Sequence, residues 1–181
     1  MAGTDDRRPA DPAGIELLVL DVDGVLTDGK VVLDADGREL KRFSVLDGAG
    51  IKYWQRAGGR VAIISGRGSP AVVARATELG VTDVVQNAKR KLPAYEAVRD
   101  RLGLSDDRIA VMGDDLPDLP LLRRAGFAIA PANAVEDVRA AADYVTAARG
   151  GEGAVREAVE MLLKRAGRWD PIMARYRRET P

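Results

Sequence analysis

Short apolar runs that alternate with helical patterns constrain this chain more than any other feature of its sequence. The apolar runs fall at residues 15–20, 60–65, 83–86, 108–112, 127–130 and 143–146, and the helical patterns at 51–56, 69–79, 92–102, 116–124, 135–141 and 152–166. Such short runs are typical of strands that are buried on both faces of a sheet. Because strand and helix alternate, the crossovers are expected to be right-handed. The sequence therefore predicts an α/β, Rossmann-like parallel sheet with helices on both faces.

One segment, at about residues 30–43, breaks the alternation directly after the first predicted strand. Two strand-like stretches flank Asp36-Gly37, a pair that suits the turn of a β-hairpin. We expect a small β-hairpin insertion that is too short to form a domain. Its apolar side chains, such as Leu33 and Leu40, could cover the domain or contact another subunit. Since an isolated two-stranded hairpin is marginally stable, the subunit contact is favoured.

The length and the ends of the chain predict its organisation. With about 150 residues for a typical domain, 181 residues favour one compact domain. We expect a disordered leader at 1–14, a single domain at 15–166 and a C-terminal tail at 167–181. The tail is interpreted as a frayed end or, alternatively, as a strap over a neighbouring subunit's site. No apolar run is long enough for a membrane span or a secretory signal, which predicts a cytoplasmic protein.

Charge and residue content exclude several functional classes. The 28 basic and 28 acidic residues cancel, so no overall field attracts nucleic acid or an anionic membrane. The chain contains neither cysteine nor histidine. This excludes disulfides, cysteine-ligated zinc and a Ser-His-Asp triad. Any chemistry must therefore use carboxylates, lysine, arginine and hydroxyl groups.

Polar residues follow the predicted strands at the edge where ligands collect in parallel α/β sheets. They are Asp21 and Asp23 after the first strand, Ser65, Gly66 and Arg67 after the second, Lys91 after the third, and Asp114, Asp115 and Asp118 after the fourth. Carboxylates this close repel one another unless a cation lies among them. Mg²⁺ commonly binds one or two carboxylates together with phosphate oxygens. The sequence therefore predicts a magnesium site that acts on a phosphorylated substrate.

These residue types fit the transfer of a phosphoryl group to a carboxylate. Asp21 could attack phosphorus once Mg²⁺ and Lys91 offset the repulsion between the two anions. Asp23 could then protonate the leaving oxygen and later deprotonate the attacking water. Ser65 and the following backbone N–H groups would hold the phosphoryl oxygens, aided by the N-terminus of the helix that begins at Ser69.

The same residues resemble the four signatures of the haloacid dehalogenase-like phosphatases. The segment DVDGVLTD at 21–28 resembles the first signature, Ser65 the second, Lys91 the third and GDDLPD at 113–118 the fourth. The resemblance implies that Asp21 is the nucleophile and Asp23 the acid/base, which also offers its backbone carbonyl to Mg²⁺. It implies that Asp114 is the remaining metal ligand and that Asp115 and Asp118 are supporting residues.

A closer resemblance covers about residues 15–163. The hairpin in place of a cap domain, DGAGI at 47–51, SGR at 65–67 and GGEGAVRE at 150–157 are similar to the 3-deoxy-D-manno-octulosonate 8-phosphate phosphatases. The resemblance implies an Mg²⁺-dependent phosphatase of lipopolysaccharide biosynthesis that works through a phosphoaspartate. It also implies a homotetramer with the hairpins at its centre, in which a neighbouring subunit helps to close each site. Leu46 and Asn87 depart from this family's usual arginine and glycine.

Three alternatives remain beside this hypothesis. The first is a phosphatase for a nine-carbon, sialic-type sugar acid 9-phosphate, against which Arg67 argues because those relatives can carry an acidic residue there. The second is a receiver-like switch that accepts a phosphoryl group. Such a switch needs no acid/base two residues after its acceptor, so Asp23 argues against it. The third is a non-catalytic subunit that serves oligomerisation.

Overall fold

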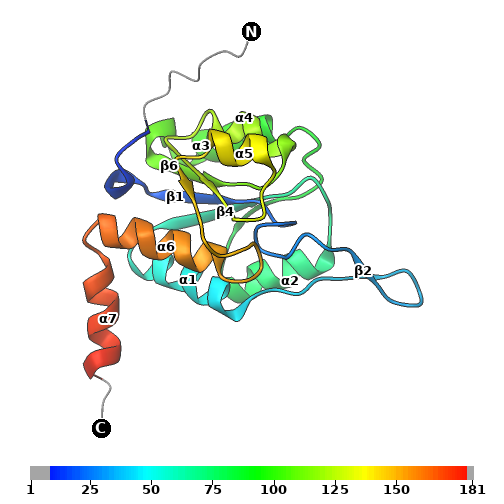
Figure 1. Ribbon diagram of the computed structural model, residues 1–181, viewed down its shortest axis with the longest axis horizontal. Helices are drawn as coiled ribbons and strands as arrows, with labels where there is room; N and C mark the ends of the chain where they lie inside the picture. Colours follow the sequence, from blue (N-terminus) through cyan, green and yellow to red (C-terminus); the bar gives the residue numbers. More distant parts are fainter. Residues whose placement is uncertain (1–8, 179–181) are drawn as a thin grey trace.

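A six-stranded parallel sheet lies between two layers of helices in the computed structural model, which describes residues 9–178 (Figure 1). The strand order is β5-β4-β1-β6-β7-β8. The strands are β1 (Leu17–Leu20), β4 (Arg60–Ile64), β5 (Asp83–Val85), β6 (Ile109–Met112), β7 (Phe127–Ala130) and β8 (Tyr144–Val145). Each is paired in parallel with its neighbours. This confirms the predicted Rossmann-like fold class.

Each face of the sheet is covered by three helices, because alternate residues of the central strands point to opposite sides. One layer holds α1 (Val45–Arg56), α2 (Pro70–Leu79) and α6 (Ala154–Arg165), and the other holds α3 (Lys91–Leu102), α4 (Leu119–Leu122) and α5 (Glu136–Ala141). Along β1, Leu18 and Leu20 pack in the first layer's core, whereas Leu17 and Val19 pack in the second. Both faces of the central strands are buried, which explains why these strands are apolar along their whole length.

Helix α1 begins six residues before the predicted start at residue 51. Ser44 is its N-cap, and the Ser44 Oγ accepts a hydrogen bond from the Asp47 amide at 3.4 Å. The polar and glycine-rich first turns hid this start from the periodicity. Gly50 has a packing reason, since a Cβ there would lie 2.8 Å from the Arg156 Cα of α6. The predicted helix at 116–124 is instead a 3-10 turn, η3 (Leu116–Asp118), followed by the short α4.

The predicted hairpin is present as β2 (Val32–Leu33) and β3 (Glu39–Leu40), paired in antiparallel register. It projects from the body of the molecule (Figure 1). Four of its apolar side chains, Val31, Val32, Leu33 and Leu40, are each between 45% and 59% exposed, whereas Phe43 at its base packs against the core. An apolar surface of this kind on a two-stranded hairpin leaves the hairpin with little stabilisation of its own.

The two ends of the described chain contain local structure. Within the predicted leader, residues 1–8 lie outside the described residues, and Pro12–Gly14 form the 3-10 turn η1. Within the predicted tail, Trp169–Arg178 form helix α7, so this part of the chain is not the frayed end that was expected. Trp169 packs edge-on against Tyr53 of α1, with ring centroids 5.9 Å apart. No helix among residues 9–178 is long and apolar enough to cross a membrane.

Asn87 has a left-handed backbone conformation, with φ of 58°, and is the one non-glycine residue in the described chain that does. This explains why a glycine suits the position. We expect Asn87→Ala to be less stable than Asn87→Gly by about 1 kcal/mol, because a Cβ without a compensating polar group is disfavoured in this conformation. Urea unfolding of the two variants measures the difference. Equal midpoints and slopes would contradict the conformational argument.

Candidate active site

A polar cavity of about 480 Å³ lies at the carboxyl ends of the central strands. Its lining includes Asp21 after β1, Ser65 after β4, Lys91 at the start of α3, and Asp114 after β6. Strand pairing sets the strand ends side by side, because β1 lies between β4 and β6 in register. Residues from four separate segments therefore meet at one edge of the sheet, where parallel α/β folds bind their ligands.

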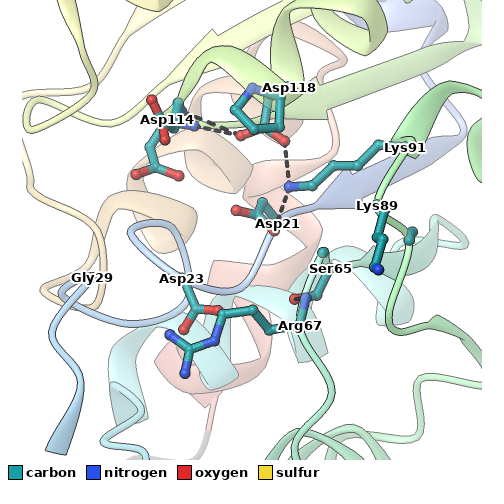
Figure 2. Close-up of a pocket in the computed structure, with 13 residues that line it drawn as sticks. Asp21, Asp23, Gly29, Ser65, Arg67, Lys89, Lys91, Asp114 and Asp118 are labelled. Atoms are coloured by element: carbon teal, nitrogen blue, oxygen red, sulfur yellow. Dashed lines mark hydrogen bonds and ion pairs between the residues drawn. The ribbon is translucent and has the colours of Figure 1, made fainter.

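Lys91 holds two carboxylates together at the centre of the cavity. Its Nζ lies 2.8 Å from Asp21 Oδ1 and 2.6 Å from Asp118 Oδ1, and Figure 2 shows the ammonium group between them. All three side chains are less than 10% exposed. Burial would lower the pKa of Lys91, but the charges of Asp21 and Asp118 outweigh it and raise the pKa. Lys91 is therefore a fixed positive charge beside Asp21.

Asp118 supports the loop that carries Asp114. Its Oδ2 accepts hydrogen bonds from the backbone N–H groups of Asp114 at 3.1 Å and Asp115 at 3.3 Å, while its other oxygen faces Lys91. Gly113 makes room for this arrangement, since a Cβ there would lie 2.4 Å from the Asp118 Cβ. Asp115 caps the η3 turn by accepting a hydrogen bond from the Leu116 amide at 2.8 Å. Asp118 thus helps to cap η3 and is also, after Asp21, the second carboxylate that pairs with Lys91.

The Asp114 carboxylate has a buried oxygen, Oδ1, with no hydrogen-bond partner. The Asp114 carboxylate lies against Gly24, and a Cβ at Gly24 would come within 1.9 Å of its other oxygen, Oδ2. Burial, followed by the charges of Asp21 and Asp118, raises the pKa of Asp114 to about 8. Burial and Asp118 likewise raise the pKa of Asp21 to about 6, although Lys91 acts in the opposite direction. The site concentrates more negative charge than one lysine offsets.

A divalent cation fits this donor set. Oxygen atoms of Asp21, Asp114 and Asp118 lie within 4.8 Å of one another. Asp118 already accepts three hydrogen bonds or ion pairs, so the unpartnered oxygen of Asp114 and the carboxylate of Asp21 are the better ligands. Hard cations such as Mg²⁺ prefer carboxylate, carbonyl and water oxygens. The Asp23 carboxylate lies outside this cluster, so only its backbone carbonyl remains available as the predicted ligand.

The loop after β4 forms another wall of the cavity. Ser65 is buried, and its Oγ accepts a hydrogen bond from the Arg67 amide at 3.2 Å. Gly66 and Arg67 both line the cavity. The Arg67 side chain is 49% exposed at the rim, where it contacts Glu39 of the hairpin at 2.5 Å. Lys89, which competes with Lys91 in the sequence, also lines the cavity.

The hairpin contributes two charged residues that the sequence analysis did not single out. Lys41 Nζ pairs closely with Asp23 Oδ1 and lies 3.4 Å from Glu39 Oε1. Glu39 begins β3 and Lys41 directly follows its last residue, and side chains two residues apart in an extended chain leave the same face. That spacing was the available signal for a shared face, although it does not say which face packs on the body, and the intervening Leu40 is exposed. The hairpin charges therefore reach the cavity instead of forming a wholly solvated surface.

Comparison with known proteins agrees with the geometry. The model of a family described as haloacid dehalogenase-like hydrolase matches residues 76–158. The 3-deoxy-D-manno-octulosonate 8-phosphate phosphatase KdsC of Escherichia coli is 42% identical over 156 residues, which cover 86% of this chain and 83% of that protein. KdsC of Yersinia pestis is 40% identical over 151 residues, which cover 83% of this chain and 81% of that protein.

A solved structure is similar over almost the whole chain. The 3-deoxy-D-manno-octulosonate 8-phosphate phosphatase of Moraxella catarrhalis, crystallised with magnesium, phosphate and KDO, has a TM-score of 0.90 and 41% identity. The match covers 92% of this chain and 95% of that one. The fold and the carboxylate cluster thus define a haloacid dehalogenase-like hydrolase. Within that class, the chain belongs to the family of 3-deoxy-D-manno-octulosonate 8-phosphate phosphatases.

Proposed function

We propose that this protein is an Mg²⁺-dependent phosphatase that hydrolyses 3-deoxy-D-manno-octulosonate 8-phosphate through a phosphoaspartate on Asp21. The observation that carries the proposal is the buried pairing of Asp21 with Lys91, 2.8 Å apart, beside the unpartnered oxygen of Asp114. This arrangement leaves negative charge that a dication offsets and a lysine that can face a phosphoryl oxygen. The relatives named above support the substrate.

The first chemical step forms a covalent bond to Asp21. Its carboxylate oxygen attacks phosphorus, the bond from phosphorus to the sugar oxygen breaks, and Asp23 gives a proton to that oxygen. Lys91 stabilises the negative charge of the transferred group, and Ser65 with the Gly66 amide holds its oxygens. When bound by Asp21, Asp114 and the Asp23 carbonyl, Mg²⁺ supplies charge neutralisation and orients the phosphoryl group.

The second step regenerates the enzyme. Asp23, now a carboxylate, accepts a proton from water as the water oxygen bonds to phosphorus and the bond to Asp21 breaks. Inorganic phosphate leaves, and Asp21 is again a free carboxylate. In both steps the residues mainly position charge, which is the principal requirement of phosphoryl transfer.

Arg67 supports a sugar acid as the substrate. Its guanidinium lies at the cavity rim and is already paired with a carboxylate, that of Glu39. Guanidinium groups bind carboxylates through two parallel hydrogen bonds, so Arg67 suits the acid group of a keto-sugar. A hexose phosphate lacks this group and gains nothing from Arg67.

A substrate panel tests the proposal. Phosphate release is measured with Mg²⁺ on eight-carbon and nine-carbon keto-acid phosphates, hexose phosphates and nucleotides. We expect the eight-carbon ester to have the highest kcat/KM, by about tenfold or more over the others. A clear preference for the nine-carbon ester would change the sugar, and a preference for hexose phosphates or nucleotides would overturn the sugar-acid assignment. One stoichiometric phosphorylation without turnover would indicate a receiver-like switch.

We also propose that the protein is a cytoplasmic homotetramer, with its hairpins at the centre, that serves lipopolysaccharide biosynthesis. The exposed Val32, Leu33 and Leu40 of the hairpin support a subunit contact, because exposed apolar side chains gathered on one short projecting element favour an interface. Light scattering on the purified chain, whose mass is 19.4 kDa, measures the assembly. A mass of one chain would contradict the tetramer. Cell fractionation with an antibody against the chain checks the location.

A further inference from the structure

Four charged side chains of alternating sign connect the predicted acid/base to the predicted substrate arginine. Asp23 pairs closely with Lys41, Lys41 lies 3.4 Å from Glu39, and Glu39 lies 2.5 Å from Arg67. We name Asp23, Lys41, Glu39 and Arg67 the charge chain. Its outer members belong to the loops after β1 and β4, and its inner members belong to the hairpin. Figure 2 labels its two outer members, Asp23 and Arg67, among the residues that line the cavity.

The burial of Lys41 sets it apart from the other cations of the hairpin. Its side chain is 3% exposed, whereas those of Lys30, Arg38 and Arg42 are 76% to 82% exposed. Removing an ammonium group from water is costly unless it is paired. Lys41 meets this cost by pairing with Asp23 and Glu39, so these charges anchor the hairpin to the site, whereas Val32, Leu33 and Leu40 of its strands are exposed.

We infer that Lys41 is a positioning residue for Asp23 and that Glu39 is a positioning residue for Arg67. The inference rests on the proposed function, in which Asp23 transfers protons and Arg67 binds the acid group. The Asp23 side chain is 26% exposed, and its contact with Lys41 limits the directions that its carboxylate can take. A displacement of about 1 Å at a reacting group can cost about 100-fold in rate.

Glu39 orients Arg67 as well as Lys41. Its Oε1 faces both Lys41 and Arg67, so one carboxylate oxygen orients two cations. Arg67 is half exposed and has a long, flexible side chain, which would otherwise lose conformational freedom when substrate binds. Holding Arg67 in place before binding therefore lowers KM for the sugar acid. Holding Asp23 in place raises kcat, because it speeds the proton transfer.

The experiment separates proton transfer from general damage by comparing two esters. The leaving group of 3-deoxy-D-manno-octulosonate 8-phosphate is a basic alkoxide that needs a proton, whereas that of p-nitrophenyl phosphate does not. In Lys41→Met, we expect first-turnover release of the sugar to fall about 10- to 100-fold, while first-turnover release of nitrophenol changes less than about threefold. Lys41→Arg, which keeps the charge, is expected to recover most of the sugar release.

Lys30→Met is the matched control, because it removes a lysine from the same hairpin that is 78% exposed. We expect it to leave both first-turnover rates within about twofold of the wild type. Glu39→Gln is expected to raise KM for the sugar acid about tenfold and to leave KM for p-nitrophenyl phosphate unchanged, because only the former carries a carboxylate for Arg67. Thermal melting of each variant verifies that it is folded.

The outcomes distinguish the inference from the proposed function. Equal losses on both esters in Lys41→Met, or rates equal to those of Lys30→Met, would overturn the positioning role of Lys41. An unchanged sugar-acid KM in Glu39→Gln would overturn the role of Glu39. Asp21→Asn is assayed alongside: if it still hydrolyses both esters, the proposed function itself fails, whereas an inactive Asp21→Asn leaves that function intact whatever the hairpin variants do.

Discussion

Asp21→Asn is expected to abolish turnover, with kcat reduced by about 10⁴-fold or more at saturating Mg²⁺. The carboxamide has nearly the same shape as the carboxylate but is a poor nucleophile toward phosphorus. Asp21 lies 2.8 Å from Lys91 within the buried centre of the cavity. Of the two carboxylates clustered with it, Asp118 is occupied by Lys91 and two amides, and Asp114 is not ion-paired with Lys91 and is the proposed metal ligand. Phosphate release from the sugar-acid ester measures the effect.

The fold of this variant is expected to survive, and its metal-free form to be at least as stable as the wild type at pH 8. Burial and Asp118 raise the pKa of Asp21 to about 6, so ionised Asp21 is destabilising there, and the neutral asparagine removes that cost. Asp36→Asn is a matched control, because Asp36 is 70% exposed at the hairpin tip. Acid quenching followed by peptide mass spectrometry should detect a phosphoryl group on the Asp21 peptide of the wild type alone. Normal turnover by Asp21→Asn would refute the phosphoaspartate.

The sheet could be predicted from the sequence because its strands are buried on both faces. The run at residues 15–20 is apolar apart from Glu16, and its strand, β1, is found at Leu17–Leu20. Helix α1 was predicted too short, because its first turns contain Asp47, Gly48 and Gly50, which read as loop residues. Asp47 is in fact buried and accepts hydrogen bonds from the Gly153 and Arg156 amides at the start of α6. Such a partner, distant in sequence, leaves no local pattern.

The candidate site was predictable in its strand-end residues but not in its hairpin residues. Asp21, Ser65 and Asp114 follow strands directly, so the topology alone brings them to one edge of the sheet. Lys91 could not be separated from Lys89 by sequence, since the choice depends on which side chain the start of α3 buries. The inward direction of Lys41 and Glu39 depends on how the hairpin packs on the body, and no periodicity over so short a segment determines that packing.

The second large effect concerns Mg²⁺ and pH. In the metal-free protein, burial and neighbouring carboxylates raise the pKa of Asp114 to about 8 and that of Asp21 to about 6, from 3.8. Between about pH 4 and pH 8 the folded state therefore binds more protons than the unfolded chain. Since stability changes with pH according to this difference, the metal-free protein is expected to lose stability as the pH rises through that window, by a few kcal/mol.

Mg²⁺ should reverse this loss, because it binds the deprotonated carboxylates that cause it. At pH 8.5, a concentration of Mg²⁺ about 100 times its Kd stabilises the folded state by about 2.7 kcal/mol, which corresponds to a rise in Tm of about 5–10 °C for a chain of this size. At pH 5.5, protons occupy Asp114 and compete with the ion. We expect the Mg²⁺-dependent rise in Tm there to be less than about 2 °C.

Thermal melting with Mg²⁺ or with chelator, from pH 5.5 to pH 8.5, measures both trends without relying on activity. Asp114→Asn is expected to flatten the metal-free profile and to remove most of the Mg²⁺-dependent rise, because it removes the group whose pKa is raised most and the ligand oxygen that has no other partner. Asp137→Asn, which changes an exposed carboxylate in the first turn of α5, should keep both. A rise in Tm of the same size at both ends of the pH range would show that Mg²⁺ does not bind these carboxylates, since an ion that displaces their protons must bind more weakly where the protons are held.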